Sequence, residues 1–595
     1  MQELDYPFDA ELILKKKKSI RKELLKDSDD FLEKRIAILG GSTTYEVKNI
    51  LELFLLHYRI KPSFYESEYN RYYEDGVFPN FQLEQFAPDF IYIHTSNRNI
   101  VLFPEVSDTR QMVDEKLDAT VDKFRRLWEQ LENKFHCPLI QNNFEPPFYR
   151  ILGNRDVTDY RGRVNFIARL NKTFADYADA HENFYIHDIN YEASVYGLER
   201  WSDPFYWDMY KYAMCVPAIP YTSFQVANII KALVGKNKKA LNLDLDNTLW
   251  GGIIGDDGVE NIEIGQETSL GQAYLEFQAY VKELKNLGVL LTVNSKNDIE
   301  TAVKGFERPD SLLRREDFVS FKSNWEPKGK NLLDTAKDLT LLPESFVFVD
   351  DNPAEREMVR KMVPGAAVPE LDSVEHYINI LDRSGYFEVV NLSEDDFNRN
   401  EMYQANERRR KAQETYTDYT EYLESLEMHG TIKGFEPVYY SRITQLTNKS
   451  NQFNLTTHRY SQSENEEASL DSLRITLYGK LEDKFGDNGV VSVVIGKRVE
   501  DILHIDLWLM SCRVLKRDME FAMMDELVKK CKETGICEIW GYYYPTAKNG
   551  MVKDFYAVQG FDKVSEDENG NTVWKYTIPE YYEKRNKVIS INERN

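Results

Sequence analysis

The stretch LNLDLDNTLWGG, residues 241–252, is an apolar strand pattern that runs directly into two aspartates, a threonine and a glycine pair. Asp244, Asp246 and Thr248 fit two interpretations. Such residues often cap the turn that follows a strand, and they also supply the polar atoms of ligand sites at the edge of a sheet. The neighbouring sequence decides between these interpretations.

Two more predicted strands in the same part of the chain also end in polar residues. VLLTVN leads into Ser295, and SFVFVD ends at Asp350 and Asp351. Amphipathic helix patterns separate the strands, which predicts a doubly wound parallel sheet whose ligand lies beyond the carboxyl ends of the strands. An acid pair, a hydroxyl group and a second acid pair are therefore expected to meet at one sheet edge.

A lysine completes the set. Lys328, in NWEPKGK, lies between the second and third of these strands, and Lys322 is the alternative for the same role. This order of motifs resembles the haloacid dehalogenase (HAD) superfamily, whose phosphotransferases use the four motifs in this order. The resemblance implies a HAD-like α/β core in this part of the chain.

The resemblance also implies a role for each side chain. Asp244 would attack phosphorus and form an aspartyl phosphate, because a carboxylate is a competent covalent nucleophile. Asp246 would protonate the leaving oxygen and then deprotonate water, with a pKa raised by adjacent carboxylates. Thr248 and Ser295 would bind the phosphoryl group, and Lys328 would neutralise the charge that develops on it.

Several carboxylates facing a phosphate would repel it without a cation, so the expected cofactor is Mg²⁺, a hard ion that takes oxygen ligands. The implied ligands are Asp244, the backbone carbonyl of Asp246, and Asp350 with help from Asp351. A predicted helix fills much of the chain between Asp244 and Ser295 and leaves room for a small hairpin flap rather than a lid domain. Such a minimal (C0-type) cap predicts an open site that a large phosphorylated partner or a neighbouring domain closes.

Longer phrases extend the resemblance to one branch of the superfamily. DLDNTLWGG, SKND, NWEPK, VDDNPAERE and the later LTNKSNQFNLTTHRY, residues 446–460, are similar to the FkbH-like branch. Relatives of this type take a glyceryl unit from 1,3-bisphosphoglycerate, remove the phosphate and deliver the acyl group to an acyl carrier protein. Those thought to carry the glyceryl group have a cysteine before the motif serine, where this chain has Asn294. Without that thiol no thioester can form there, so phosphate removal is favoured over glyceryl transfer.

The whole chain is predicted to be a multidomain α/β protein, because strands and helices alternate along most of it. The predicted parts are an SGNH-hydrolase-like α/β domain at 1–235, the HAD-like phosphatase domain at 238–375, a helical connector at 376–429, and a GNAT-like α+β domain at 430–595.

The first of these domains contains GGSTT after a short strand, and Ser42 stands in the place of the SGNH nucleophile. Asn97 matches the asparagine of that family. The late DxxH block has only Asp203, without a histidine three residues later, and a nucleophilic serine needs a base. Ser42 is therefore expected to cap a helix, and the domain is expected to be a degenerate hydrolase fold used for binding or assembly.

The last domain resembles GNAT acyltransferases, in which a strand leads into a pyrophosphate-binding helix through an R-x-x-G-x-G/A loop. Arg513 is present, but Lys516 and Asp518 take the glycine positions. Their side chains crowd the backbone groups that would hold phosphates, so coenzyme A binding is not expected. Cys512 is expected to be a small buried hydrophobe.

Composition excludes several classes of protein. The formal net charge of −24 argues against non-specific nucleic-acid binding and against a polybasic membrane contact. No apolar stretch approaches the roughly 18 residues of a membrane span, and no signal-peptide pattern is present. Five scattered cysteines do not form a disulfide framework, and a cytoplasmic location is expected. They are Cys137, Cys215, Cys512, Cys531 and Cys537.

Three functional hypotheses follow. The leading one is a Mg²⁺-dependent phosphatase or phosphotransferase that acts on a phosphorylated glyceryl or sugar-like group, possibly carrier-linked. The second is glyceryl transfer to an acyl carrier protein, with another cysteine such as Cys512 in place of the missing thiol. The third is a non-catalytic scaffold in a biosynthetic complex. The intact motifs from Asp244 to Asp351 favour the first.

Overall fold

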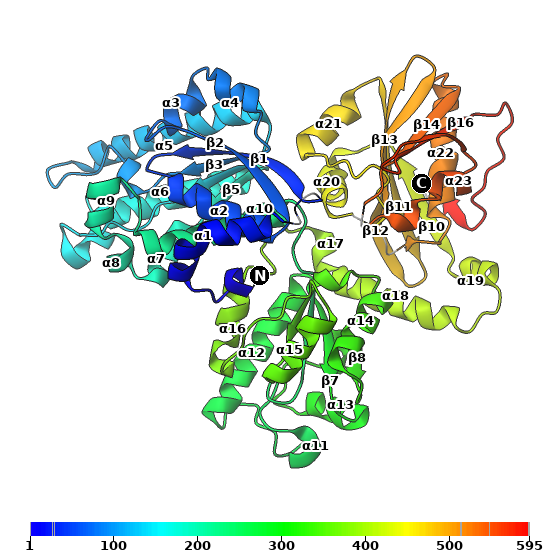
Figure 1. Ribbon diagram of the computed structural model, residues 1–595, viewed down its shortest axis with the longest axis horizontal. Helices are drawn as coiled ribbons and strands as arrows, with labels where there is room; N and C mark the ends of the chain where they lie inside the picture. Colours follow the sequence, from blue (N-terminus) through cyan, green and yellow to red (C-terminus); the bar gives the residue numbers. More distant parts are fainter. Residues whose placement is uncertain are drawn as a thin grey trace. The chain divides into compact units, whose positions relative to one another are not determined.

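The computed structural model describes residues 2–26, 28, 30–450, 452–511, 514–546 and 548–592, without the side chains of 394, 395 and 449. Contacts divide the chain into two compact units, Met1–Leu233 with Glu388–Val390 and Val234–Phe387 with Asn391–Asn595. One β-sheet lies in the first unit and two lie in the second (Figure 1). The protein is therefore a multidomain α/β structure, as the sequence predicts.

The first sheet is parallel throughout, in the order β2-β1-β3-β4-β5. Its strands are β1 (Leu32–Gly40), β2 (Ile60–Glu66), β3 (Phe90–His94), β4 (Leu139–Asn142) and β5 (Phe184–His187). The short strand predicted before GGSTT is confirmed as β1, and β3 and β4 are central strands of the same kind, because buried parallel strands have nearly continuous apolar sequences. β2 was not predicted, since this edge strand is only partly buried and contains Pro62.

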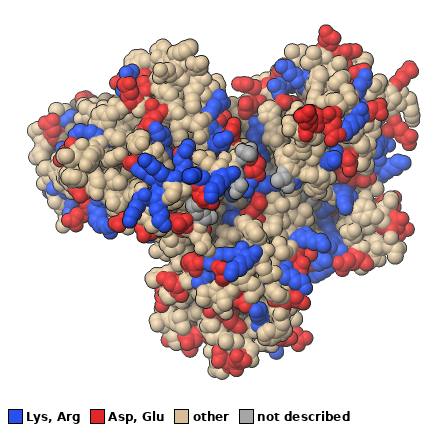
Figure 2. All heavy atoms as spheres, in the orientation of Figure 1, with Lys and Arg blue, Asp and Glu red and all other residues tan. Residues whose placement is uncertain are grey.

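Helices cover both faces of this sheet (Figure 1). On one face, Phe124 and Trp128 of α5 pack with Phe174 of α6 against β3. The longer helices are α1 (Ala10–Leu24), α2 (Tyr45–His57), α5 (Arg110–Phe135), α6 (Arg163–Ala180) and α10 (Ile219–Leu233). The basic run at residues 15–18 lies on α1, and Figure 2 shows basic side chains gathered over this helix. The run is a solvated helix face, as its sequence predicts.

The second sheet is also parallel, in the order β8-β7-β6-β9. Its strands are β6 (Ala240–Leu243), β7 (Leu290–Ser295), β8 (Phe318–Ser323) and β9 (Phe346–Val349), and its main helices are α12 (Ser269–Asn286), α13 (Ile299–Glu307), α14 (Lys328–Asp338), α15 (Pro353–Met362) and α16 (Val374–Arg383). The three predicted strands are confirmed. β8 is an additional edge strand, which the sequence hides because most of it is only partly buried.

The chain between β6 and α12 forms the expected small flap, but not as a hairpin of two strands. A four-residue helix, α11 (Ile254–Asp257), occupies its tip. A single antiparallel bridge closes it, because Gly251 and Glu263 exchange backbone hydrogen bonds of 3.0 and 2.8 Å. Gly251 and Gly252 allow the close turn, and the φ of Gly252 is 90°. Most of the remaining flap consists of turns and bends, so it contains one bridge rather than two paired strands.

The third sheet has eight strands in the order β15-β16-β14-β13-β12-β11-β10-β17. Its strands are β10 (Met428–Lys433), β11 (Arg474–Asp483), β12 (Gly486–Val499), β13 (Ile502–Met510), β14 (Glu538–Tyr543), β15 (Asp562–Glu566), β16 (Thr572–Thr577) and β17 (Ile589–Ile591). β13 and β14 are parallel, and β13 leads into the region before α22 (Met519–Glu533). None of the described helices is both long and apolar enough to cross a membrane.

A segment of the NKSNQFNLTT run lies between β13 and β14. The two strands pair only at Ile502–His504 with Glu538–Trp540. Beyond that point, the backbone of Phe453–Leu455 bonds to both: Leu455 donates to Trp508 and accepts from Tyr544, at 3.1 and 2.9 Å. This part of the run is therefore inserted into the sheet between β13 and β14. Its polar residues help to hold it there: Thr456 donates to the carbonyl of Asp506, and the carbonyl of Asn454 accepts from Asn549.

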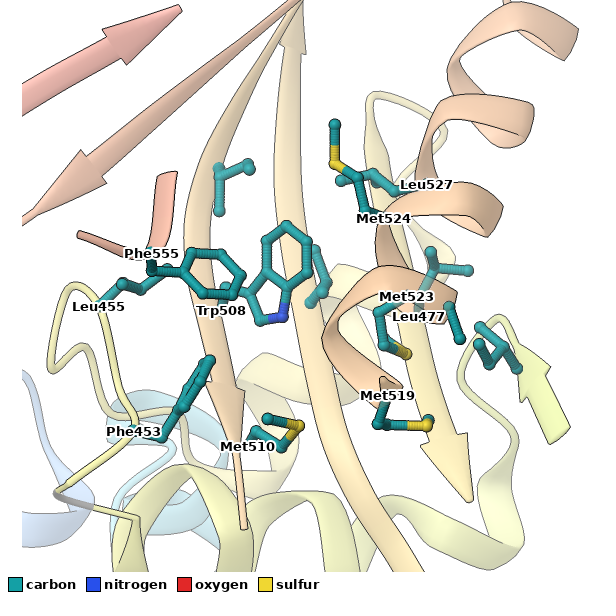
Figure 3. Close-up of a cluster of buried hydrophobic side chains, with 14 of the residues drawn as sticks. Phe453, Leu455, Leu477, Trp508, Met510, Met519, Met523, Met524, Leu527 and Phe555 are labelled. Carbon is teal, nitrogen blue, oxygen red and sulfur yellow. The ribbon is translucent and has the colours of Figure 1, made fainter. Parts of the chain in front are cut away.

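The inserted segment also packs into the hydrophobic core of this part of the chain. Figure 3 shows Trp508 at the centre, with Phe453 and Phe555 on one side and the methionines of α22 on the other. The rings of Trp508 and Phe555 meet edge to face, with centroids 4.9 Å apart. Methionine side chains adapt to such irregular surroundings.

The predicted pyrophosphate loop precedes α22. Cys512 and Arg513 lie outside the described residues. Lys516 and Asp518 both adopt left-handed backbone conformations, with φ of 63° and 62°. This conformation favours glycine, so the two residues do occupy positions at which a glycine-rich loop would place glycines.

Candidate active site

The candidate site is built at the carboxyl ends of β6, β7 and β9. Asp244 follows β6, Ser295 ends β7, and Asp350 and Asp351 follow β9. Lys328 is the first residue of α14. Because β6 lies between β7 and β9 in the sheet, these residues converge as the sequence predicts.

The Lys328 ammonium joins the two acidic motifs. Its Nζ lies 2.9 Å from Asp244 Oδ2 and 2.6 Å from Asp350 Oδ2. All three side chains are buried, and a buried charge is stable only when it is paired. Lys322 instead pairs with Asp338 at 2.8 Å on the surface. Lys328 is therefore the lysine of this site.

Burial sets the acid–base properties of the cluster. It raises the pKa of Asp244 to about 6, with Lys328 opposing the rise and Asp350 adding to it. Burial also raises the pKa of Asp350 and of Asp351. For Lys328, burial lowers the pKa, but the attraction of Asp244 and Asp350 outweighs this effect, so the net pKa is raised. Lys328 therefore stays protonated and holds the carboxylates together.

Three carboxylates form a set that fits a divalent cation. One oxygen each from Asp244, Asp350 and Asp351 lies within 4.8 Å of the others. Oxygen-only ligands on one side of a site suit Mg²⁺, which usually keeps several waters. The raised pKa values of the three carboxyl groups agree with this fit, because a cation relieves the repulsion among them. The side chain of Asp246 is not one of the three.

Asp246 is oriented by N–H donors instead. Its Oδ1 accepts hydrogen bonds from Trp250 Nε1 and from the backbone of Ile254, at 2.9 and 3.1 Å. Its Oδ2 accepts one from Asn297 Nδ2 at 2.7 Å, and the same amide donates to Ser295 Oγ at 3.2 Å. Asn297, in the SKND motif, thus links two predicted site residues. The sequence does not indicate this role, because it depends on the packing of two loops.

Arg356 and Thr248 position the second acid pair. Arg356 Nη1 donates to the carbonyl oxygens of Asp350 and Asp351, both at 2.8 Å. The Asp351 amide donates to Thr248 Oγ1 at 3.2 Å. Thr248, expected to bind phosphate, is thus already a partner of the loop after β9. The hydroxyl hydrogen of Thr248 is left for a second partner.

Asn294, the residue before Ser295, is held by its own side-chain hydrogen bonds. Its buried amide donates to Asn242 Oδ1 at 3.0 Å and to the carbonyl of Lys328 at 2.8 Å. Its Oδ1 accepts from Asn331 at 3.2 Å. Asn294 therefore ties β6 and β7 to the start of α14, which sets the position of Lys328.

The solved structure of the N-terminal part of the protein BF1531 from Bacteroides fragilis is similar to this chain. It contains a phosphatase domain and is complexed with Mg. The two are 31% identical, the match covers 63% of this chain and 99% of that one, and the TM-score is 0.59. The chain belongs to the same family as BF1531. The predicted HAD-like core thus agrees with a relative that has a phosphatase domain.

Residues 35–231 match the family model described as FkbH, N-terminal domain. No curated protein matches the chain. The ribosomal-protein-S18-alanine N-acetyltransferase from Escherichia coli matches with 12% identity over 26% of this chain and 97% of that one, with a TM-score of 0.21. A GNAT-family acetyltransferase from Streptococcus pneumoniae matches with 14% identity over 25% of this chain and 100% of that one, with a TM-score of 0.22.

Ser42 lies just after β1, in the part of the chain that matches the FkbH N-terminal model, and the prediction that it caps a helix is wrong. The residue that precedes α2 is Thr44, two positions later. Ser42 is buried, and its hydroxyl has no hydrogen-bond partner among the described residues. The turn before α2 needs glycine at position 41, because a Cβ there would lie 2.5 Å from the Asn99 side chain.

Asn97 joins two loops of the FkbH N-terminal domain. Its side-chain amide donates to the carbonyls of Glu145 and Pro146, at 3.3 and 3.1 Å. Its backbone amide donates to Glu145 Oε2 at 3.1 Å. Asp203 caps α9 (Pro204–Tyr210) by accepting from Phe205. The resemblance to SGNH hydrolases stays a prediction, and these contacts are those of structural residues.

A buried polar network runs along the β3, β4 and β5 ends of the same domain, and the sequence does not reveal it. His187 Nδ1 lies 2.7 Å from Asn142 Oδ1, and His187 Nε2 lies 2.8 Å from Glu192. Tyr92 lies 2.8 Å from His94 Nδ1. Burial, reinforced by His187, lowers the pKa of His94 to about 3. The network is therefore held mainly by uncharged groups around His94.

Proposed function

We propose that this protein is a Mg²⁺-dependent phosphatase or phosphotransferase of the HAD type that works through an aspartyl phosphate on Asp244. The observation that carries the proposal is the contact of Lys328 with both Asp244 and Asp350, beside Asp351. One cationic side chain among three convergent carboxylates suits a phosphoryl group and a divalent cation. The relative BF1531, with its phosphatase domain complexed with Mg, supports the same conclusion.

In the first step, a carboxylate oxygen of Asp244 attacks phosphorus as the bond from phosphorus to the leaving oxygen breaks. The leaving oxygen takes the electron pair and receives a proton from Asp246. Water then attacks phosphorus as the bond from phosphorus to the Asp244 oxygen breaks, and Asp246 accepts the proton of the water. Inorganic phosphate is released, and the electron pair of the broken bond restores the Asp244 carboxylate. The N–H groups around Asp246 hold its carboxyl group in one orientation during both transfers.

The negative charge of the phosphoryl group would be neutralised by Lys328 and by a cation. Asp244, Asp350 and Asp351 would hold that cation. The cation supplies positive charge to the phosphoryl oxygens. Lys328 adds a fixed ammonium group in a buried position, where electrostatic stabilisation is stronger than in water. Ser295 and Thr248 supply hydroxyl groups for the phosphoryl oxygens. With a pKa of about 6, Asp244 is mainly ionised at neutral pH, as a nucleophile must be.

The proposed substrate is a phosphorylated glyceryl or sugar-like group, either free or carrier-linked. The small flap supports a site that accepts a phosphoryl group attached to a larger molecule. The FkbH N-terminal match supports a carrier-linked substrate. Asn294 counts against a thioester at the site, because it has no thiol, and its three hydrogen bonds show that its amide has a structural role instead. Phosphate removal is therefore the reaction that the geometry supports best.

The test uses hydrolysis of an aryl phosphate by the full chain, with and without Mg²⁺. Asp244→Asn should reduce the rate by about 10³-fold or more, since it removes the nucleophile. Asp256→Asn is the matched control, because this exposed flap acid lies outside the cluster. Acid quenching and mass spectrometry should find phosphate on Asp244. Activity that survives in Asp244→Asn would exclude the proposal.

A further inference from the structure

The helix α9 of the FkbH N-terminal domain buries none of its residues. Phe205, Met209 and Tyr210 are 53%, 63% and 51% exposed. Helices in proteins are normally stabilised by packing an apolar face, and here much of the apolar side-chain surface is in water. α9 is nonetheless held in place, because Thr43 donates to the carbonyls of Tyr210 and Lys211 at 2.8 and 2.9 Å.

Two loops that follow β3 and β4 expose similar side chains. Val101 and Val106 are exposed in the loop after β3. Phe148, Tyr149 and Ile151 are exposed in the loop after β4. Because β1, β3 and β4 are parallel neighbours, these loops and the start of the chain after β1 lie at the same edge of the sheet. Large exposed apolar patches are uncommon on monomeric proteins and mark interaction sites.

Arginine side chains connect the three segments into one surface. The Arg98 guanidinium lies 5.0 Å from the ring centre of Phe148 and 5.2 Å from that of Trp207 on α9. Arg163 lies 4.8 and 5.0 Å from the rings of Phe103 and Tyr149. Each arginine thus bridges two segments. We call the surface formed by α9 with Lys211, by Arg163, and by residues 98–106 and 148–151 the Arg98 face.

The cations of the Arg98 face lack acidic partners within the described part of the chain. Arg98, Arg163 and Lys211 have no carboxylate oxygen within 4 Å among the described residues. The same segments also carry two exposed acids, Glu105, which lies 3.9 Å from Lys116, and Asp208 on α9. The three cations lie on aromatic rings instead, and Lys211 is 5.4 Å from the ring of Trp207. A cation held over a ring still offers its N–H groups to an anion.

We infer that the Arg98 face is a docking surface for an acidic protein segment that carries exposed apolar side chains. Aromatic residues and arginine are the types enriched at the centres of protein interfaces. The unpaired cations complement carboxylates, and the aliphatic residues Val101, Val106, Ile151 and Met209 suit apolar side chains. The bases of a single-stranded nucleic acid would stack on the aromatic rings but would have no use for the aliphatic side chains. The net charge of −24 opposes a long polyanion as well.

The test measures fluorescence anisotropy of a labelled helical peptide composed of Glu, Asp, Leu and Phe upon addition of the full chain. Phe148→Ser and Arg98→Ala should each weaken binding by about tenfold or more, as expected for residues at the centre of an interface. Phe205→Ser is a second variant that removes an exposed apolar side chain from the Arg98 face. Added salt should weaken binding, because part of the attraction is between exposed charges.

Matched controls lie elsewhere on the same domain. Phe81→Ser changes an exposed aromatic residue of α4 (Phe81–Phe86), and Arg126→Ala changes an exposed arginine of α5. Both should bind the peptide as the unchanged chain does. The inference fails if the acidic peptide does not bind, if the Arg98-face variants bind it normally, or if labelled oligo(dT) or a Lys/Leu peptide binds at least as tightly. Aryl phosphate hydrolysis should be unaffected in all five variants, so the two proposals are tested separately.

Discussion

The first and second sheets are both parallel, and both place polar residues at their carboxyl ends, yet they treat charge in opposite ways. Around β6 and β9, a buried lysine pairs with two buried aspartates. Around β3 and β4, burial favours the uncharged form of two groups: it lowers the pKa of His94 to about 3 and raises the pKa of Glu145 to about 8. His187 of the same network lies 2.8 Å from Glu192.

Under the proposed function, this difference separates a catalytic site from a polar network that stabilises a domain. Opposite charges that converge in a buried place can interact strongly with a charged substrate, because the dielectric constant there is low. Neutral buried groups joined by hydrogen bonds stabilise a domain without attracting ions. A polar sheet edge is therefore not by itself evidence of catalysis. The net charge of its buried groups is a better indication of whether such an edge is an active site.

The largest effect is expected when the charge pairing of the second sheet is broken. Lys328→Met should lower kcat/KM for an aryl phosphate by about 10²–10³-fold, because it removes a preorganised cation from the phosphoryl site. Steady-state kinetics at saturating Mg²⁺ measures this. Lys322→Met is the matched control, since Lys322 pairs with Asp338 away from the cluster. Similar losses in both variants would mean that Lys328 has no special role.

A smaller effect is expected from weakening the carboxylate set. Asp351→Asn should raise the Mg²⁺ concentration for half-maximal activity by roughly tenfold or more, because it removes one anionic oxygen from the proposed metal site. Titration calorimetry with Mg²⁺ gives the same comparison without substrate. An unchanged affinity for Mg²⁺ would place the metal elsewhere, and Asp256→Asn again serves as the control.

The protonation of buried Glu145 beside the first sheet can be tested by varying the pH. The pKa of Glu145 is about 8 in the folded chain, above its ordinary value of 4.5, so the folded state binds more protons between these values. The stability that this group contributes is full below pH 4.5 and is lost as pH rises through 8. Between pH 6 and 8 the loss is about 2 kcal/mol.

Glu145→Gln should remove that loss, since glutamine cannot ionise and can still accept the hydrogen bond from Asn97. Urea denaturation at pH 6 and pH 8 measures the difference in the free energy of unfolding. The unchanged chain should lose stability over this interval and the variant should lose less. If both lose the same amount, Glu145 is not the group that titrates.

The smallest effect is expected at Ser42. Its buried hydroxyl has no partner among the described residues, so it contributes desolvation cost without a hydrogen bond. Ser42→Ala should therefore raise the free energy of unfolding by up to about 1 kcal/mol, measured by urea denaturation. A loss of stability of similar size would show that the hydroxyl is bonded in solution.

The parts of the candidate site that the sequence predicts are those that lie at strand ends. β6, β7 and β9 are short apolar runs, and Asp244, Ser295 and Asp350 follow directly from where those runs end. Lys328 required the order of motifs as well, because it begins a helix. The hydrogen bonds of Asn297, Thr248 and Arg356 depend on how separate loops pack, and no local pattern records that.

The edge strands and the Arg98 face show a second limit. β2 and β8 are partly exposed edge strands, so neither has the apolar run of a central strand. The aromatic residues of α9 look like residues of a hydrophobic core in the sequence, yet the helix buries none of them. Burial is a property of the whole fold, and a local pattern can indicate only which residues are able to be buried.

The insertion of Phe453–Leu455 between β13 and β14 has a consequence for any shortened form of this chain. The segment is synthesised before β13, and its last hydrogen-bond partner, Tyr544, is synthesised much later. A chain that stops before Tyr544 would leave Leu455 with an open strand edge, and open edges promote self-association. Soluble fragments should therefore end before β10 or include all strands through β16.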